Sequence, residues 1–189
     1  MSGRTAVITG ATGHLGRTIA ETLAEIGFNL ILVDLPKSDF LSLGNNLKKF
    51  PKIKIYNVLC DLEIEESRKK ALKQISENHT NISCLVNNAA FVATSQLEGW
   101  LDPFENQSID TWRKAFEVNL TSAFHFCQSL TPLLKISDGA NIINITSIYG
   151  QYGPDWEIYK DTKMGNPAAY ASSKGGLCQL TKWLATTLS

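Results

Sequence analysis

The chain has 189 residues, of which 18 are basic, 18 are acidic and 43% are hydrophobic. This length and composition suit one globular domain with a full core, and they exclude a disordered, fibrous or disulfide-stapled chain. The formal charge of zero excludes the broad positive field on which non-specific binding to nucleic acid or to an anionic membrane depends.

Short apolar runs alternate with segments of helical period along the whole chain, as in a parallel sheet covered by helices on both faces. The predicted strands are Thr5–Thr9, Asn29–Asp34, Lys54–Cys60, Cys84–Asn87 and Ala140–Thr146. The predicted helices are Leu15–Ile26, Asp39–Phe50, Glu63–Asn78, Ser108–Lys135 and Pro167–Ser189. We therefore expect an α/β fold of the Rossmann type, a doubly wound parallel sheet with about five strands in the order 3-2-1-4-5.

Two stretches lack clear periodicity, Phe91–Gln107 and Gln151–Asn166, and both follow strand ends. Open α/β sheets bind ligands at the carboxyl ends of their strands. We therefore predict that these stretches are substrate loops.

A glycine-rich turn follows the first strand and leads directly into a helix. Gly10 suits a tight turn, Gly13 lets the backbone approach a pyrophosphate, and Gly16 lets the helix pack close to the sheet. The helix N-terminus adds amide donors and a partial positive charge. Glycines in this strand-turn-helix context predict a dinucleotide site.

Two carboxylates follow the next strands. Asp34, 18 residues beyond Gly16, ends the second strand, where it would accept hydrogen bonds from an adenosine ribose and repel a 2′-phosphate. It therefore favours NAD over NADP; the alternative is a carboxylate that only caps the strand. Asp61 follows the third strand and either contacts the adenine amino group or caps the next helix, and these two interpretations have equal weight.

A tyrosine and a lysine share one face of the last predicted helix. Asn166 as N-cap and Pro167 at the first helical position mark its start. The helix N-terminus and the Lys174 ammonium both favour the phenolate of Tyr170, which suits it for general acid–base work. The spacing alone also fits an amphipathic helix with a snorkelling lysine. Ser147, expected at the same sheet edge, favours the catalytic interpretation because its hydroxyl could hold a substrate oxygen.

A polar residue interrupts the apolar stripe of the helix predicted over Ser108–Lys135. The stripe consists of Ile109, Trp112, Phe116, Ala123, Phe126 and Leu130, with Asn119 in its middle. A buried amide needs hydrogen-bond partners. Asn119 therefore either bridges backbone groups or holds a water that could pass protons from Lys174 to solvent.

As a set, these residues resemble the short-chain dehydrogenase/reductase family from Thr5 to the end of the chain. The resemblance also covers Asn87-Asn88-Ala89-Ala90 and Val118-Asn119-Leu120. It implies that Tyr170 transfers a proton, that Lys174 binds the nicotinamide ribose and that Ser147 orients the substrate oxygen. Asn119 would join the proton relay, and Asn87 would stabilise the central strands. The implied cofactor contacts are Thr9, Gly10, Gly13, His14, Leu15, Gly16, Asp34, Asp61, Leu62, Asn88, Ala89, Ala90, Tyr170 and Lys174.

The chain departs from the family pattern at three places. His14 stands where the common turn has glycine, so that Gly13 gives a spacing more typical of the nucleotide-sugar-modifying branch. Ala90 replaces the usual glycine. Ser147 and Tyr170 lie 23 residues apart, about ten more than the family resemblance implies, because of the loop Gln151–Asn166.

That loop mixes aromatic and charged side chains. Its aromatic residues Tyr152, Trp156 and Tyr159 stand beside carboxylates, which suits a sugar or another polyol. It is similar to oxidoreductases of bacterial flagellin and surface-glycan modification around Glu157-Ile158-Tyr159 and Asn166-Pro167. The alternative is a loop that only packs against a dimer partner or against the first substrate loop.

The last residues of the chain and the spacing of its cysteines allow two further predictions, about the extent of the domain and about the cellular compartment. Family chains continue into a sixth strand, a substrate lid and a seventh strand, so we expect an incomplete single domain over residues 1–189 with strand five at an exposed edge. The four cysteines are widely spaced, which predicts buried thiols in a reducing, cytoplasmic setting and no metal site. No apolar run approaches the about 20 residues of a membrane span, and no signal peptide precedes the first strand.

Three functions are consistent with the sequence. The first is an NAD-dependent oxidoreductase that moves a hydride between nicotinamide and a secondary alcohol or ketone. The others are a nucleotide-sugar epimerase or dehydratase that uses NAD transiently, and a non-catalytic NAD-binding module. The expected partners are a small-molecule substrate and further copies of the chain in a homo-oligomer, with no nucleic acid and no membrane.

Overall fold

A computed structural model describes residues 3–92 and 97–188. Positions 93–96 of the first predicted substrate loop and Ser189 of the last predicted helix lie outside the described residues. The chain divides into two compact units. Unit 1 comprises Met1–Ala89 and His125–Ile145, and unit 2 comprises Ala90–Phe124 and Thr146–Ser189.

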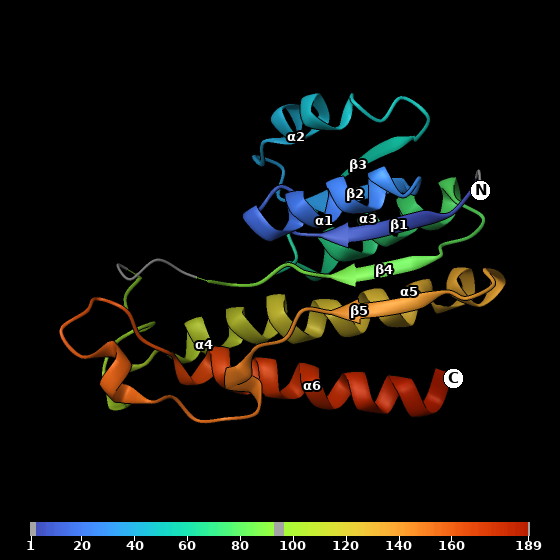
Figure 1. The fold of residues 1–189 in the computed structure, drawn as a ribbon. Helices are drawn as coiled ribbons and strands as arrows, with labels where there is room; N and C mark the ends of the chain where they lie inside the picture. Colours follow the sequence, from blue (N-terminus) through green and yellow to red (C-terminus); the bar gives the residue numbers. More distant parts are fainter. Residues whose placement is uncertain (1–2, 93–96, 189) are drawn as a thin grey trace. The chain divides into compact units, whose positions relative to one another are not determined.

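Unit 1 holds a five-stranded parallel sheet in the order β3-β2-β1-β4-β5 (Figure 1). Its strands are β1 (Thr5–Thr9), β2 (Asn29–Asp34), β3 (Ile55–Leu59), β4 (Cys84–Asn87) and β5 (Asn141–Asn144). The predicted fold class and strand order are confirmed. The edge strands β3 and β5 are shorter than predicted at both ends, although the backbone of Lys54, Cys60 and Ile145 beside them still bonds to the neighbouring strand.

Helices cover both faces of the sheet of unit 1 because its central strands carry apolar side chains on both faces. Ala6, Ile8 and Leu30 form one core with α1 (His14–Glu25) and α2 (Phe40–Leu47). The side chains on the opposite face of the strands, such as those of Val7 and Ile31, are also fully buried. The end of α5 (Ser122–Ile136) lies on that second face, where the Asn87 amide donates to the Cys127 sulfur at 3.3 Å. The helix α3 (Glu65–Asn78) also belongs to this unit.

Unit 2 is mostly helical. It contains α4 (Ile109–Phe116), a π-helical turn η2 (Glu117–Thr121), the start of α5, and α6 (Ala168–Leu188). Short 3-10 turns η1 (Phe104–Asn106), η3 (Ile148–Gly150) and η4 (Trp156–Tyr159) lie in its loops. Among the described helices, none combines the length and the apolar character needed to cross a membrane.

The π turn corrects the predicted apolar stripe. Ile109 and Trp112 are exposed, whereas Thr111 and Ala115 are buried in line with Asn119. A π turn holds one more residue than an α turn, so the helix before it is rotated relative to the helix after it. The predicted stripe was therefore wrong at Ile109 and Trp112, whereas Phe116 is half-buried and Ala123, Phe126 and Leu130 are buried as predicted.

Candidate active site

The glycine turn of unit 1 is closed around backbone atoms. Gly10 has a φ of +64°, and a Cβ atom there would lie 2.8 Å from the Cα of Ala89. A Cβ atom on Gly16 would lie 2.0 Å from the carbonyl oxygen of Gly10. Both positions therefore require glycine. At Gly10 the reasons are the positive φ and the lack of space for a Cβ atom, and at Gly16 the reason is the lack of space alone.

The end of β4 is tied to this turn by side chains. The Thr9 hydroxyl accepts hydrogen bonds from the amides of Asn88 and Ala89 at 3.1 and 3.2 Å. In return, the Asn88 side chain donates to the carbonyls of Thr9 and Gly10, both at 3.0 Å. These four bonds place the predicted cofactor contacts Thr9, Gly10, Asn88 and Ala89 together.

The N-terminus of α1 is open to a ligand. Its N-cap is Gly13, which provides no side-chain cap, and the next two residues, His14 and Leu15, are exposed. A Cβ atom on Gly13 would have only the Gly10 carbonyl oxygen near it, at 3.4 Å. Uncapped amides at a helix N-terminus suit phosphate oxygens, so these residues fit the pyrophosphate of a dinucleotide.

Asp34 fastens the end of β2 to the same turn. Its Oδ2 accepts from the Thr12 amide and hydroxyl, both at 2.8 Å. Its Oδ1 accepts from the Leu35 amide at 2.8 Å and from the Ser38 hydroxyl at 2.9 Å. All four bonds lie within the chain, as expected for the alternative of a carboxylate that caps the strand, and a bond from Asp34 to a ribose stays a prediction. Arg17 completes the turn by donating to the Thr12 carbonyl at 2.7 Å.

Asp61 and Leu62 lie in the turn that leads into α3. Asp61 Oδ1 accepts from the Glu63 amide at 3.0 Å, and the Asp61 amide donates to the Ser67 hydroxyl at 2.9 Å. Leu62 is buried, with 7% of its surface exposed. Asp61 therefore shapes the approach to the helix, which begins at Glu65 rather than at Glu63.

Tyr170 and Lys174 lie one turn apart on α6, in unit 2. The Lys174 side chain is buried, with 2% of its surface exposed, and its Nζ lies 5.9 Å from the centre of the Tyr170 ring. Burial lowers the pKa of Lys174 to about 8, which still leaves the ammonium charged at neutral pH. Tyr170 packs against the buried cluster of Trp100, Ala115 and Ala169.

Ser147 belongs to the same unit and is held close to α6 by its loop. Its hydroxyl accepts from the Tyr149 amide at 3.2 Å at the start of η3. A Cβ atom on Gly150, which ends η3, would lie 2.8 Å from the carbonyl carbon of Lys174. The close packing of this loop on α6 therefore brings Ser147 to the helix that carries Tyr170.

Asn119 bridges two segments of unit 2. Its Oδ1 accepts from the Phe91 amide at 2.6 Å, and its Nδ2 donates to the Ser173 hydroxyl at 3.0 Å. Ser173, which is fully buried, donates in turn to the Tyr170 carbonyl at 3.0 Å. Asn119 therefore fixes the helix turn between Tyr170 and Lys174 through its side chain.

The predicted N-cap role of Asn166 is wrong. The first residue of α6 is Ala168, and its amide donates to Oε1 of Gln107 at 3.1 Å. Neither polar atom of the Asn166 side chain has a hydrogen-bond partner in the described part of the chain, although the residue is buried. The cap comes from a side chain 61 residues away, which local sequence pattern does not reveal.

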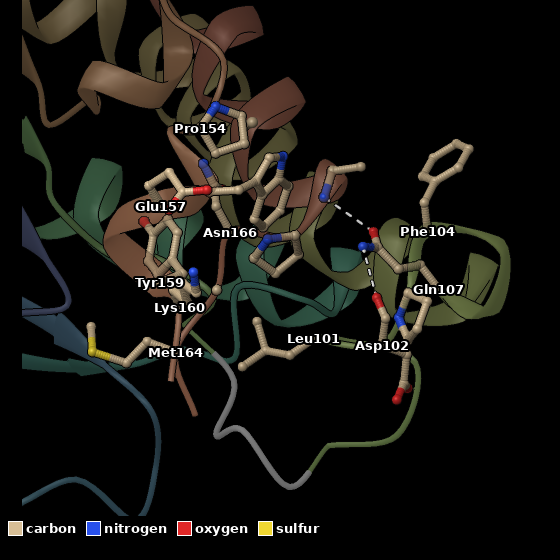
Figure 2. A pocket seen from close by; sticks show the side chains of 16 residues that line it. Leu101, Asp102, Phe104, Gln107, Pro154, Glu157, Tyr159, Lys160, Met164 and Asn166 are labelled. Carbon is tan, nitrogen blue, oxygen red and sulfur yellow. Dashed lines mark hydrogen bonds between the residues drawn. The ribbon is translucent and has the colours of Figure 1, made fainter. Parts of the chain in front are cut away.

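A cavity of about 680 Å³ lies beside the start of α6, between the two predicted substrate loops. Leu101–Gln107 and Pro154–Ala171 contribute its walls (Figure 2). Tyr159 on this wall is hydrogen-bonded through its hydroxyl to that of Tyr149, which raises the pKa of Tyr159 to about 12. Described residues of both predicted loops therefore line one cavity, and Gln107 of the first loop bonds to the start of α6.

Sequence reasoning missed three residues that shape these sites. They are Thr12 beside Asp34, Gln107 at the start of α6 and Tyr149 beside Tyr159. Thr12 lies inside the glycine turn, so its position was a usable signal; Gln107 depends on a partner 61 residues away, and Tyr149 on a partner 10 residues away across a loop without periodicity. No cluster of three or more metal-ligating side chains occurs within residues 3–92 and 97–188.

The chain matches a family model described as short chain dehydrogenase over residues 4–189. An uncharacterized short-chain type dehydrogenase/reductase of Sinorhizobium fredii is 32% identical over 189 residues, which are 97% of this chain and 29% of that protein. The 3-oxoacyl-[acyl-carrier-protein] reductase of Aquifex aeolicus is 30% identical over 190 residues, which are 100% of this chain and 69% of that protein. The chain thus spans only part of each relative.

Solved structures share the fold. An NAD+-bound xylitol dehydrogenase has a TM-score of 0.81 at 25% identity, covering 99% of this chain and 65% of that one. The NADP complex of RhlG from Pseudomonas aeruginosa has a TM-score of 0.80 at 27% identity, covering 100% of this chain and 68% of that one. Both nicotinamide cofactors therefore occur among similar proteins.

Proposed function

Because the chain belongs to the short-chain dehydrogenase family, we propose that it is an oxidoreductase that interconverts a secondary alcohol and a ketone with NAD. The observation that carries this proposal is the grouping of Ser147, Tyr170 and the buried Lys174 in unit 2, with Asn119 bonded to the same helix. Unit 1 contributes the glycine turn and Asp34, which suit the adenosine and pyrophosphate part of a dinucleotide.

The proposed chemistry assigns one role to each side chain. Bound nicotinamide would supply the hydride acceptor or donor. The Tyr170 hydroxyl takes the proton of the alcohol during oxidation and returns it during reduction. The Ser147 hydroxyl donates a hydrogen bond to the same substrate oxygen, and the Lys174 ammonium stabilises the phenolate of Tyr170. Asn119 and Ser173 hold the turn of α6 on which this geometry depends.

The choice of NAD over NADP rests on Asp34. Its carboxylate has hydroxyl partners in Thr12 and Ser38, and a 2′-phosphate placed there would meet a negative charge. Asp61 and the backbone at Leu62 would line the adenine side, and Ala90 would follow Ala89 along the cofactor. We propose that affinity for NAD exceeds affinity for NADP.

The remaining expectations concern the cellular compartment, the oligomeric state and the kind of substrate. Three free thiols, Cys60, Cys84 and Cys127, are buried, which favours a reducing and hence cytoplasmic compartment. Ile109, Trp112 and Trp183 expose apolar surface on helices of unit 2, which supports a homo-oligomer. A small molecule is the proposed substrate.

Cofactor reduction by the chain tests the proposal. With NAD and a panel of secondary alcohols, we expect net NADH release, and Tyr170→Phe should lower kcat at least about 100-fold while NAD binding stays unchanged. Turnover of a sugar nucleotide without net NADH would instead support the epimerase, which the Gly13 spacing favours. Cofactor binding without any turnover would support a non-catalytic module, and full activity of Tyr170→Phe would contradict the mechanism.

A further inference from the structure

The long loop between Ser147 and Tyr170 is bonded back onto the turn that follows Ser147. That turn is η3, and the first part of the loop contains η4, which ends at Tyr159. The hydroxyl groups of Tyr149 in η3 and Tyr159 in η4 share a hydrogen bond, and their ring centres are 6.4 Å apart. The bond therefore joins the loop to the turn beside Ser147.

Tyr159 is held in place by its own turn. Its carbonyl accepts hydrogen bonds from the Thr162 amide at 3.1 Å and from the Thr162 hydroxyl at 2.7 Å. Its ring lies against that of Trp156, with 6.0 Å between the ring centres. The bond to Tyr149 raises the pKa of Tyr159 to about 12, so the Tyr159 hydroxyl is protonated at neutral pH. Tyr159 therefore offers Tyr149 a fixed and uncharged partner.

Tyr149 connects this bond to Ser147 through its backbone. The Tyr149 amide donates to Oγ of Ser147 at 3.2 Å, and within the described residues this is the only hydrogen bond of that hydroxyl. A hydroxyl group has one donor proton and two acceptor lone pairs. Because the amide uses a lone pair, the proton of Ser147 is left for a substrate oxygen. The position of the Tyr149 amide therefore sets the direction in which Ser147 can donate.

The turn η3 depends on Tyr149 for its side-chain anchor. A single 3-10 turn has hydrogen bonds of poorer geometry than those of an α-helix, so it is a weak support by itself. Of its three residues, Ile148 is 69% exposed and Gly150 has no side chain to anchor it. Tyr149 is half-buried, and its hydroxyl bonds only to Tyr159 among the described residues. The backbone contact of Gly150 with Lys174 holds the end of the turn, and Tyr149 holds its middle.

We propose that Tyr159 is a positioning residue for the Ser147 hydroxyl, acting through the bond between the two tyrosine hydroxyls and through the Tyr149 amide. This inference rests on the proposed function, in which Ser147 orients the substrate oxygen. It gives the long loop between Ser147 and Tyr170 a task in turnover, because the loop supplies the side chain that holds the Ser147 turn in place.

Turnover of the full chain with NAD and isopropanol, cyclohexanol or myo-inositol tests the inference. Tyr159→Phe removes one hydroxyl, and we expect kcat to fall at least about fivefold while the dissociation constant of NAD stays unchanged. Ser147→Ala should lower kcat about 100-fold, and the double variant Ser147→Ala/Tyr159→Phe should be no slower than Ser147→Ala alone. Tyr152→Phe is the matched control in the same loop, because Tyr152 is 70% exposed, and it should keep full activity.

Hydrogen exchange of the Tyr149 amide, followed by NMR, tests the same link without turnover. Tyr159→Phe should raise this exchange rate at least about tenfold, because the turn opens more often, whereas Tyr152→Phe should leave it unchanged. If none of the three alcohols is oxidised, the proposed function fails, and the exchange rate alone decides the role of Tyr159. An unchanged kcat or an unchanged exchange rate in Tyr159→Phe, or losses of kcat that multiply in the double variant, overturns the inference.

Discussion

Gly150 lies directly against the main chain of Lys174. A Cβ atom at position 150 would stand 2.8 Å from both the carbonyl carbon and the carbonyl oxygen of Lys174, and 3.0 Å from the amide nitrogen of Gly175. These are backbone atoms of a helix, so they cannot move aside at low cost. The contact therefore sets the distance between the loop that carries Ser147 and the helix that carries Tyr170.

Gly150→Ala should accordingly impair turnover more than binding. We expect kcat to fall about 10-fold to 100-fold, because a shift of about 1 Å between reacting groups has effects of this size. The dissociation constant of NAD, measured by titration, should change little. Gly153→Ala is the control in the same loop, since a Cβ atom there meets nothing within 4 Å. Equal kcat values for the two variants would contradict this account.

Two glycines of the phosphate turn should respond differently to alanine. Gly16→Ala places a Cβ atom 2.0 Å from the Gly10 carbonyl oxygen, and we expect the free energy of unfolding to fall by about 2 kcal/mol or more. Gly13→Ala meets only one atom, at 3.4 Å, so its stability should fall by less than about 1 kcal/mol. Its affinity for NAD should nevertheless drop at least about tenfold, because the methyl group takes the space of a pyrophosphate. Urea denaturation and NAD titration measure the two effects, and unchanged NAD affinity in Gly13→Ala would count against the site.

Burial of Lys174 should make stability depend on pH. Its pKa is lowered from 10.5 to about 8 in the folded chain, so between these values the unfolded chain binds more protons than the folded chain. The free energy of unfolding therefore rises with pH in this window, by at most about 1.4 kcal/mol per pH unit. Relative to Lys174→Met, the unsubstituted chain should gain about 1 to 3 kcal/mol between pH 8 and 10.5. Parallel pH profiles of denaturation for the two proteins would show that the lysine is not desolvated.

Loss of the Asn119 bridge should destabilise unit 2. Asn119→Ala leaves the Phe91 amide without its acceptor and removes the donor to Ser173, so we expect a loss of about 2 to 3 kcal/mol in the free energy of unfolding. Asn78→Ala is the matched control, because Asn78 is exposed at the end of α3 and its side chain donates to the Gln74 carbonyl of its own helix. Its effect should stay below about 0.5 kcal/mol. Similar losses for both variants in urea denaturation would remove the bridging role.

The sheet could be predicted from sequence because its determinants are local. Each strand is a short apolar run bounded by turn residues, and β1, β2 and β4 have the predicted limits. The order of the strands could be predicted because the glycine turn after β1 is typical of the dinucleotide-binding α/β fold, in which the strand order is 3-2-1-4-5. The helical Tyr170–Lys174 pair was equally accessible, because a spacing of four residues within one helix fixes their common face.

Features that depend on distant partners could not be predicted. The π turn at Glu117–Thr121 adds a residue that no periodicity announces, and it moved Ile109 and Trp112 out of the buried face. The cap on Ala168 comes from Gln107, so the local signal of Asn166 before proline was misleading. The roles of Ser147, Tyr170 and Lys174 in turnover stay predictions.

Under the proposed preference for NAD, the hydrogen bonds of Asp34 constrain any redesign of the chain toward NADP. A small neutral residue at position 34 would admit an extra phosphate, but it would also release the Thr12 amide and hydroxyl, and with them the shape of the glycine loop. Such a substitution would raise the affinity for NADP and, at the same time, make the glycine loop less ordered. A successful redesign would therefore remove the charge at position 34 and keep an acceptor for Thr12. Asp34→Asn does both, because its side chain is neutral and retains one oxygen.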